Sequence, residues 1–153
     1  MAIAPASYHL RPARVTDAEA IAACVDAAYS PYVERMGRKP GPMLEDYSKV
    51  IRERQVTVAE IDGTVAGVLV LLVTNEGFLL DNVAVQPGHR GIGKALLEHA
   101  ESEARRQGFG SIHLYTHEKM TENQALYSKI GYIEYDRRVE NGFRRVYMRK
   151  KLL

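Results

Sequence analysis

Three consecutive apolar runs constrain the fold of this chain more than any other feature. They are QVTVAEI (55–61), TVAGVLVLLV (64–73) and FLLDNVAV (78–85), and their β-branched and leucine residues favour strands. Asp62-Gly63 separates the first two runs and is a strong hairpin signal, and Asn75-Glu76-Gly77 turns the chain again. Connections this short join antiparallel neighbours, because a parallel pair needs a long crossover. The sequence therefore predicts an antiparallel meander.

Helices and further strands are expected on both sides of the meander. Before it, apolar spacing predicts a strand at 8–11, a helix over about 16–35 and a second helix that begins near Met43. After it, we expect a helix ending at Gly108, a strand at 111–117, a helix from Thr121 to Gly131, and two strands joined through Asn141-Gly142. Thr16 with Glu19, and Thr121 with Gln124, have capping-box spacing.

This order of elements predicts an α+β fold with a mixed, mostly antiparallel sheet of six to seven strands flanked by four helices. The 153 residues suit one domain, which we expect to span residues 1–153. The net charge of +2 is too small for the basic face of a nucleic-acid-binding protein. The sequence contains neither a signal-peptide pattern nor an apolar run that spans a bilayer. With Cys24 as its single cysteine, the protein is expected in the cytoplasm, without a membrane partner.

The segment PGHRGIGKALLEHA (87–100) contains the spacing G-x-x-x-x-G-K of a nucleotide-hydrolase phosphate loop. Ala95, however, stands where that loop needs a Ser or Thr hydroxyl for Mg²⁺. The antiparallel meander before it also differs from the parallel sheet of those enzymes. A nucleotide-binding protein is therefore a remote alternative, and a plain turn that lets a helix pack on a strand is another.

The same segment suits a diphosphate ligand that needs no metal. Glycines expose the backbone amides, and the start of a helix adds partial positive charge. Arg90 and Lys94 add two full charges beside Gly91 and Gly93.

Two motifs resemble the GCN5-related N-acetyltransferase (GNAT) superfamily. That family has an acetyl-CoA-binding core in which a strand ending V-x-P precedes R/Q-x-x-G-x-G/A and a pair of leucines. Here the pattern corresponds to Val85-Gln86-Pro87, Arg90, Gly93, Ala95 and Leu96-Leu97. The family's second motif is similar to NQALYSKIGY, through Asn123, Ala125, Tyr127, Lys129 and Gly131. Counted back from the leucines instead, the loop is two residues short, and Gly91 and Gly93 are the equivalent glycines.

The resemblance implies transfer of an acetyl group from acetyl-CoA to an amine by direct attack in a ternary complex, without a metal. It assigns the cofactor to the main chain of Val83, Ala84 and Val85, to the loop residues Arg90, Gly91, Ile92, Gly93, Lys94 and Ala95, and to Asn123. It implies Tyr127 as general acid, with helix packing as its structural alternative. Asp81 is the candidate general base, with a solvated carboxylate at a strand end as the alternative interpretation.

The amine acceptor, a small molecule or a peptide, is expected to contact the region of the first two helices. Its candidate residues are Tyr29, Tyr32, Met43 and Asp46, although Asp46 and Glu45 also suit the start of a helix. His113, His117 and Cys24 are interpreted as packing residues. A homodimer through the closing strands is possible. An acyl-CoA-binding sensor without turnover is the main alternative function.

Overall fold

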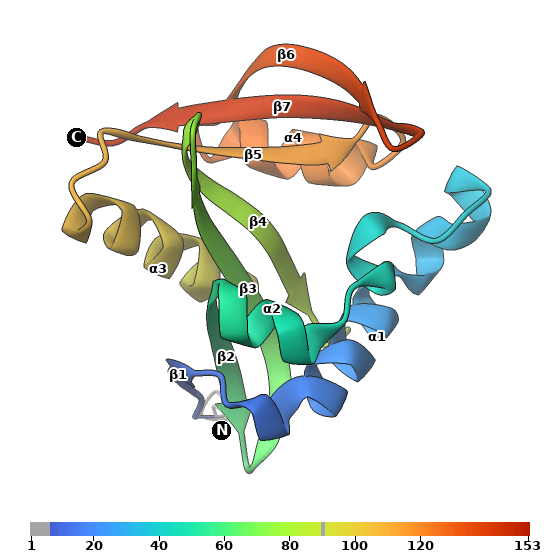
Figure 1. The fold of residues 1–153 in the computed structure, drawn as a ribbon, viewed down its shortest axis with the longest axis vertical. Helices are drawn as coiled ribbons and strands as arrows, with labels where there is room; N and C mark the ends of the chain where they lie inside the picture. The colour runs from blue at the N-terminus through green and yellow to red at the C-terminus, as the bar shows by residue number, and fades with distance from the viewer. Residues whose placement is uncertain (1–6, 90) are drawn as a thin grey trace, which may run out of the picture.

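One mixed sheet of seven strands organises the described part of the chain, residues 7–89 and 91–153 of a computed structural model (Figure 1). The strands are β1 (His9–Pro12), β2 (Gln55–Ile61), β3 (Thr64–Thr74), β4 (Gly77–Val85), β5 (Ser111–His117), β6 (Ile133–Glu140) and β7 (Phe143–Lys151). The α-helices are α1 (Ala18–Met36), α2 (Tyr47–Glu53), α3 (Ile92–Arg106) and α4 (Thr121–Lys129), with short 3-10 helices at Val15–Asp17 and Gly41–Leu44.

The sheet has the strand order β1-β2-β3-β4-β5-β7-β6, in which β4 and β5 are the only parallel neighbours among the described strands. The predicted meander is confirmed as the antiparallel run β2-β3-β4. Both hairpin signals are confirmed as well. Asp62 and Gly63 have positive φ values of 49° and 78°, and Asn141 and Gly142 have 53° and 79°. These are the left-handed conformations that a tight two-residue hairpin requires.

Helices cover both faces of the sheet and enclose two apolar cores. Helices α1 and α2 pack on one face, around Ile21, Val25, Val58 and Val68. Helices α3 and α4 lie on the other face, where Leu96 and Tyr127 belong to the larger core. Figure 1 shows α1 and α2 on the opposite side of the sheet from α3. The predicted fold class is confirmed.

Both predicted capping boxes are wrong. The segment with Thr16 forms a 3-10 turn before α1, and the Asp17 carboxylate accepts a hydrogen bond from the Arg14 N–H at 2.7 Å. Thr121 is the first residue of α4 rather than its cap, and the Gln124 amide donates instead to the carbonyls of His117 and Glu118.

The second helix also begins later than predicted. Met43 lies in the 3-10 helix, and α2 starts at Tyr47 after the N-cap residue Asp46. The Asp46 carboxylate accepts hydrogen bonds from the N–H groups of Ser48 at 3.1 Å and Lys49 at 3.5 Å. Asp46 therefore satisfies amides that have no partner within the helix.

A β-bulge at Asp81 changes which of the two cores the side chains of β4 enter. Val70 pairs with Asn82 whereas Leu71 pairs with Leu80, so Asp81 is an extra residue in β4. Leu80 belongs to the α3 core, but Asn82, two residues later, contacts tyrosines of α1 and α2. The inserted residue reverses the alternation of side chains along the strand.

Helix α3 approaches β3 closely at Gly67. A Cβ atom on this glycine would lie 2.8 Å from Cγ2 of Ile92 and 3.0 Å from Cδ1 of Leu96. Because Ile92 is the first residue of α3, the absence of a side chain at Gly67 determines how closely the start of this helix approaches the sheet.

We expect Gly67→Ala to lower the free energy of unfolding by about 1–3 kcal/mol, the usual cost of inserting a methyl group into a filled core. Urea unfolding measures the change. Gly110→Ala is the matched control, because a Cβ there meets no heavy atom within 4 Å. Equal unfolding midpoints for the two variants would contradict the packing argument.

Candidate active site

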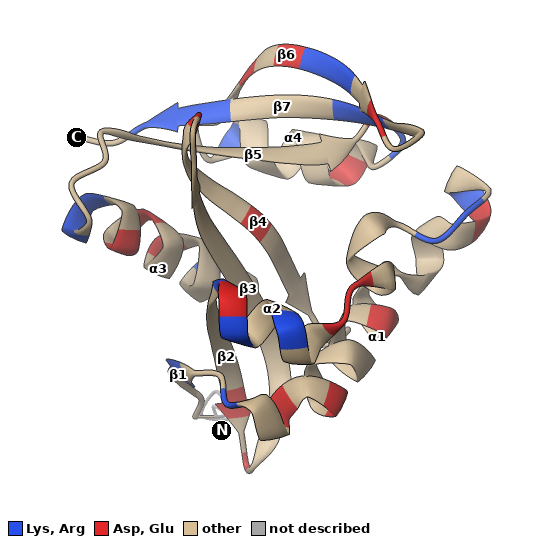
Figure 2. Ribbon diagram, in the orientation of Figure 1, with Lys and Arg blue, Asp and Glu red and all other residues tan. Residues whose placement is uncertain are grey.

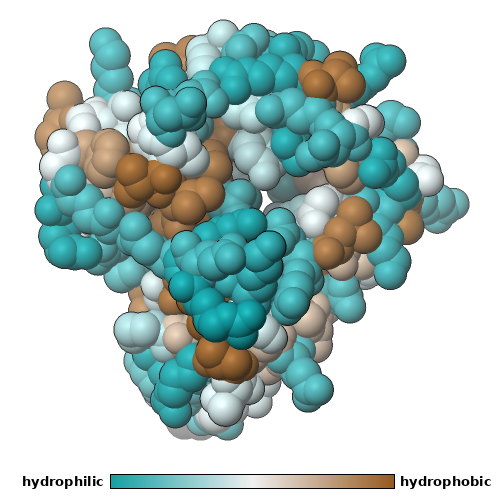
Figure 3. All heavy atoms as spheres, in the orientation of Figure 1, coloured by the Kyte–Doolittle hydropathy of each residue, from teal (hydrophilic) through white to brown (hydrophobic). Residues whose placement is uncertain are grey.

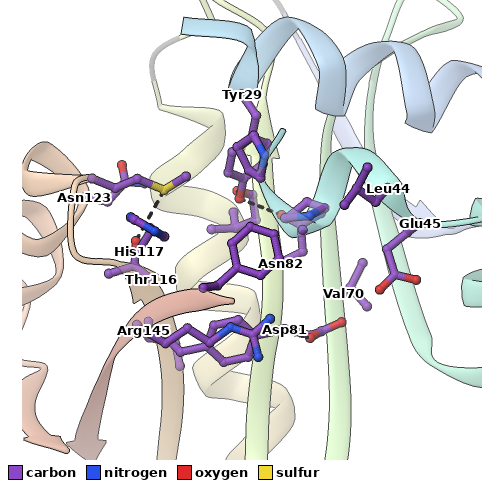
Figure 4. A pocket seen from close by; sticks show the side chains of 18 of the residues that line it. Tyr29, Leu44, Glu45, Val70, Asp81, Asn82, Thr116, His117, Asn123 and Arg145 are labelled. Atoms are coloured by element: carbon purple, nitrogen blue, oxygen red, sulfur yellow. Dashed lines mark hydrogen bonds between the residues drawn. The ribbon is translucent and has the colours of Figure 1, made fainter. Parts of the chain in front are cut away.

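A cavity of about 330 Å³ opens between the β5–β7 side of the molecule and the α1–α2 side. Figure 3 shows the hollow between these parts, and Figure 4 shows the side chains around it. Its lining includes Tyr29, Asp81, Asn82, Val83, Tyr115, His117, Asn123, Tyr127 and Arg145. The cavity therefore brings together residues from both motifs and from the bulge.

The strands β4 and β5 separate at this cavity. Their parallel pairing covers only Phe78–Leu80 with Ile112–Leu114, although β4 continues to Val85. The Gln86 N–H donates a hydrogen bond to the Ala66 carbonyl of β3. Because backbone groups alternate in direction along a strand, those of Ala84 also point toward β3. The N–H and C=O groups of Val83 and Val85 therefore face away from β3, along the open edge. The strands are therefore apart at Val83–Val85, where the resemblance assigns the cofactor, and the Tyr29 hydroxyl donates to the Val83 carbonyl at 3.3 Å.

Asp81 forms an ion pair inside the cavity. Its Oδ2 accepts a hydrogen bond from Nη1 of Arg54 at 2.7 Å, and its Oδ1 accepts one from the Tyr115 hydroxyl at 3.3 Å. The Asp81 side chain is 13% exposed. Nη1 of Arg54 also lies 3.5 Å from Oε1 of Glu45, so one guanidinium pairs with two carboxylates. Asp81 is thus a positioned carboxylate rather than a solvated one.

The Tyr127 side chain is buried and lines the same cavity. Its ring meets the Tyr132 ring edge-on, with centroids 5.7 Å apart. Burial raises the pKa of Tyr127 to about 12. The hydroxyl therefore keeps its proton at neutral pH and can donate it.

Asn82 links the two helices above the cavity to β4. Its amide oxygen accepts a hydrogen bond from the Tyr29 hydroxyl at 2.8 Å, and its amide nitrogen donates to the Tyr47 hydroxyl at 3.3 Å. The Tyr47 hydroxyl donates to the Pro42 carbonyl at 2.6 Å. Burial raises the pKa of both tyrosines, which therefore remain neutral donors. This network fixes one wall of the cavity, as Figure 4 shows for Tyr29 and Asn82.

The glycine loop ends at Gly91, whose φ of 90° makes it the left-handed N-cap of α3. The Ala95 N–H donates to the Gly91 carbonyl at 3.0 Å, so this predicted phosphate donor is already used within the helix. The N–H groups of Ile92, Gly93 and Lys94 precede that first helical bond. Arg90, the remaining loop candidate, lies outside the described residues.

The other predicted residues occupy different places. Tyr29 and Asn123 line the cavity, whereas Tyr32, Met43 and Asp46 are not among its lining residues. Ala84 is buried in the α1–α2 core. Of the four residues predicted to bind the acceptor, only Tyr29 therefore lines the cavity.

The interpretation of His113 and Cys24 as packing residues is confirmed, since both are buried. Burial raises the pKa of the Cys24 thiol to about 11. His117 instead lines the cavity, and burial lowers its pKa. Its Nδ1 accepts a hydrogen bond from the Lys119 N–H, so the neutral ring carries its proton on Nε2. The neutral His117 ring therefore has an N–H donor at Nε2 and no free lone pair at Nδ1.

Sequence reasoning missed several polar residues of the cavity, among them Arg54, Asn82, Tyr115 and Arg145. Asn82 had a signal, because it is a second polar residue inside an otherwise apolar strand. The other three come from separate elements, and the assembled fold brings Arg54 and Tyr115 to Asp81 and Arg145 to the Tyr115 ring.

Residues 7–89 and 91–153 lack two kinds of feature. They contain no group of three or more His, Cys, Asp or Glu that could hold a metal ion. No helix among them is long and apolar enough to cross a membrane.

The chain matches one protein-family model and resembles many solved structures. The model of the acetyltransferase (GNAT) family matches residues 21–132. No curated protein matches the chain.

Three solved structures represent the folds found. The PaiA N-acetyltransferase from Thermoplasma acidophilum, in complex with coenzyme A, is 21% identical with a TM-score of 0.78, covering 95% of this chain and 99% of that one. The ribosomal-protein-S18-alanine N-acetyltransferase from Escherichia coli is 19% identical with a TM-score of 0.76, covering 95% and 94%. The IAA acetyltransferase from Bacillus cereus is 22% identical with a TM-score of 0.68, covering 95% and 100%. At these identities the likeness shows the fold.

Proposed function

Because the chain belongs to the acetyltransferase (GNAT) family and is an acetyl-CoA-dependent N-acetyltransferase, we propose that its reaction takes place in the cavity between β4 and β5. The observation that carries this proposal is the open edge of β4 beside a cavity that contains both Asp81 and Tyr127. Unpaired backbone groups are costly when buried, so this edge suits a ligand that completes their hydrogen bonds.

The residues present fit acetyl-CoA. Acetyl-CoA supplies the acetyl group as a thioester. The N–H groups of Val83 and Val85 and the C=O of Val85, which face away from β3, are our candidates for binding the pantetheine arm. The Val83 carbonyl already accepts a hydrogen bond from the Tyr29 hydroxyl. The N–H groups of Ile92, Gly93 and Lys94, together with the α3 dipole, are our candidates for the pyrophosphate. Asn123, which lines the cavity, is retained as a further contact.

Two side chains are proposed to move protons. The acceptor amine must be neutral to attack, and Asp81 is our candidate to take its proton, held in place by Arg54 and Tyr115. Tyr127 holds a proton on its buried hydroxyl and is our candidate to donate it to the leaving sulfur. Direct attack by the amine needs no covalent enzyme group.

The domain, the cellular compartment and the partners are also part of this proposal. We propose that a single domain over residues 1–153 carries the reaction, in the cytoplasm, on the amine of a small molecule or peptide. The modest net charge supports the absence of a nucleic-acid or membrane partner. The exposed Ile133 and Val139 on the edge strand β6 support a homodimer through the closing strands.

We expect acetyl-CoA and CoA to raise the Tm by several degrees at saturating concentration, because ligands that bind only the native state stabilise it. Thermal denaturation with acetyl-CoA, CoA and Mg·ATP is the measurement. A thiol-release assay with a panel of amines then separates an enzyme from an acyl-CoA sensor. Stabilisation by Mg·ATP alone would overturn the proposed site.

A further inference from the structure

Two arginines converge on one aromatic ring of the cavity. The guanidinium carbon of Arg38 lies 3.9 Å from the centroid of the Phe143 ring, and that of Arg145 lies 5.7 Å from the same centroid. Arg38 follows α1, whereas Arg145 comes from β7, and both line the cavity. Gly142 leaves room for Arg38, since a Cβ there would lie 2.8 Å from its Nη1.

These arginines are incompletely neutralised. Arg145 meets the Glu140 carboxylate only at 3.4 Å, and the same Glu140 oxygen also accepts a hydrogen bond from the Tyr147 hydroxyl. Within residues 7–89 and 91–153, no carboxylate lies within ion-pair distance of Arg38, whose hydrogen bond goes to the Asn141 carbonyl at 3.5 Å. Arg54, by contrast, faces both Asp81 and Glu45. The Arg38–Arg145 end of the cavity therefore carries excess positive charge.

A single tyrosine spans the distance between this positive end and the carboxylate of Asp81. The Tyr115 hydroxyl donates to Asp81, while the guanidinium carbon of Arg145 lies 4.3 Å from the centroid of the Tyr115 ring. Figure 4 shows Arg145 and Asp81 along the same part of the cavity. A short molecule with an amine at one end and an anion at the other matches this spacing of charges.

We infer that the acceptor is a small amine that also carries an anionic group, a carboxylate or a phosphate, bound by Arg38 and Arg145 while its amine lies at Asp81. This inference rests on the proposed function of the cavity. Contact with the aromatic rings holds the two guanidinium groups in place, and each has several N–H groups that can bind an anion. Arginine binds carboxylates and phosphates through paired hydrogen bonds, which gives such a site geometric selectivity.

The test compares amines of matched length with and without an anionic group. Thiol release from acetyl-CoA is measured with short amino acids, with their carboxamides and with aminoalkylphosphonates of the same length. We expect kcat/KM for the preferred anion to exceed that for the carboxamide by about 10- to 100-fold. The phosphonates then show which anion the enzyme prefers.

Arg38→Gln and Arg145→Gln are each expected to reduce this preference by about 10-fold or more, mainly through KM. Arg144→Gln is the matched control, since Arg144 is the neighbouring exposed arginine of β7 and pairs with Glu118 outside the cavity lining. The control should retain the full preference.

Equal kcat/KM for acids and carboxamides would overturn the inference, as would an unchanged preference in both glutamine variants. If no amine is acetylated, titration calorimetry with CoA present replaces the rates, and failure of every anionic amine to bind also overturns it. Failure of the proposed site looks different, because acetyl-CoA itself would then not stabilise the protein.

Discussion

Replacing Tyr127 by phenylalanine is expected to lower kcat by about 10²–10⁴-fold, the usual range for a lost general acid. The substitution keeps the aromatic ring that packs in the α3–α4 core and removes only the hydroxyl. With a pKa of about 12, that hydroxyl is a proton donor throughout the neutral range. Because the proton is needed at the departing sulfur, kcat should fall while acetyl-CoA binding is retained. Steady-state thiol release gives kcat, and calorimetry gives the affinity for acetyl-CoA.

Tyr132→Phe is the matched control for this variant. The Tyr132 ring contacts Tyr127, and its hydroxyl is buried without a hydrogen-bond partner among the described residues. Tyr132 is not among the residues that line the cavity. Its kcat should equal that of the native protein, with stability unchanged or slightly higher, since an unsatisfied buried hydroxyl is removed. A folded Tyr127→Phe variant with native kcat would exclude Tyr127 as the acid.

Asp81→Asn is expected to lower kcat/KM by about 10²-fold or more at neutral pH, because asparagine cannot take a proton from the acceptor. The defect should shrink as the pH rises toward the pKa of the acceptor amine. At that pH a growing fraction of the amine is already neutral, so the base is needed less. A pH profile of kcat/KM for the native and variant proteins measures both effects.

A merely structural role for Asp81 would give a different result. Loss of the ion pair with Arg54 would then lower the rate by a similar factor at every pH. Asp136→Asn provides the control, because Asp136 also pairs with an arginine, Arg138, but on the surface. It should show native kcat/KM throughout. A pH-independent loss in Asp81→Asn would contradict the role of base.

The sequence predicted the parts of the fold that local patterns determine. The meander and both hairpins follow from alternating strand residues and from Asp62-Gly63 and Asn141-Gly142, which specify their turns without help from distant residues. The capping boxes failed because other partners take part at both helix starts. The Gln124 amide donates to the carbonyls of His117 and Glu118 before α4. Arg11 of β1 donates to the Asp17 carboxylate at 2.8 Å, and the chain forms a 3-10 turn before α1 begins.

The candidate site was predictable only where a motif marked it. Tyr127 and the glycine loop stand in recognisable patterns. Asp81 was expected at a strand end, whereas it lies within β4, at the bulge. The partners of Asp81 could not be found in this way. Arg54 is 27 residues before it and Tyr115 is 34 residues after it, and neither stands in a motif. Pairing of the strands, rather than local spacing, makes these three residues neighbours.

The bulge in β4 also has a consequence for how such an enzyme can change over evolution. As the extra residue of the strand, Asp81 belongs to neither of the two apolar cores. A substitution at this position therefore alters the chemistry of the cavity without requiring either core to repack. Neighbours such as Leu80 and Ala84 lack this freedom, because each is tied to one core. The inserted residue is thus a position at which the group that takes the proton can change while the scaffold is preserved.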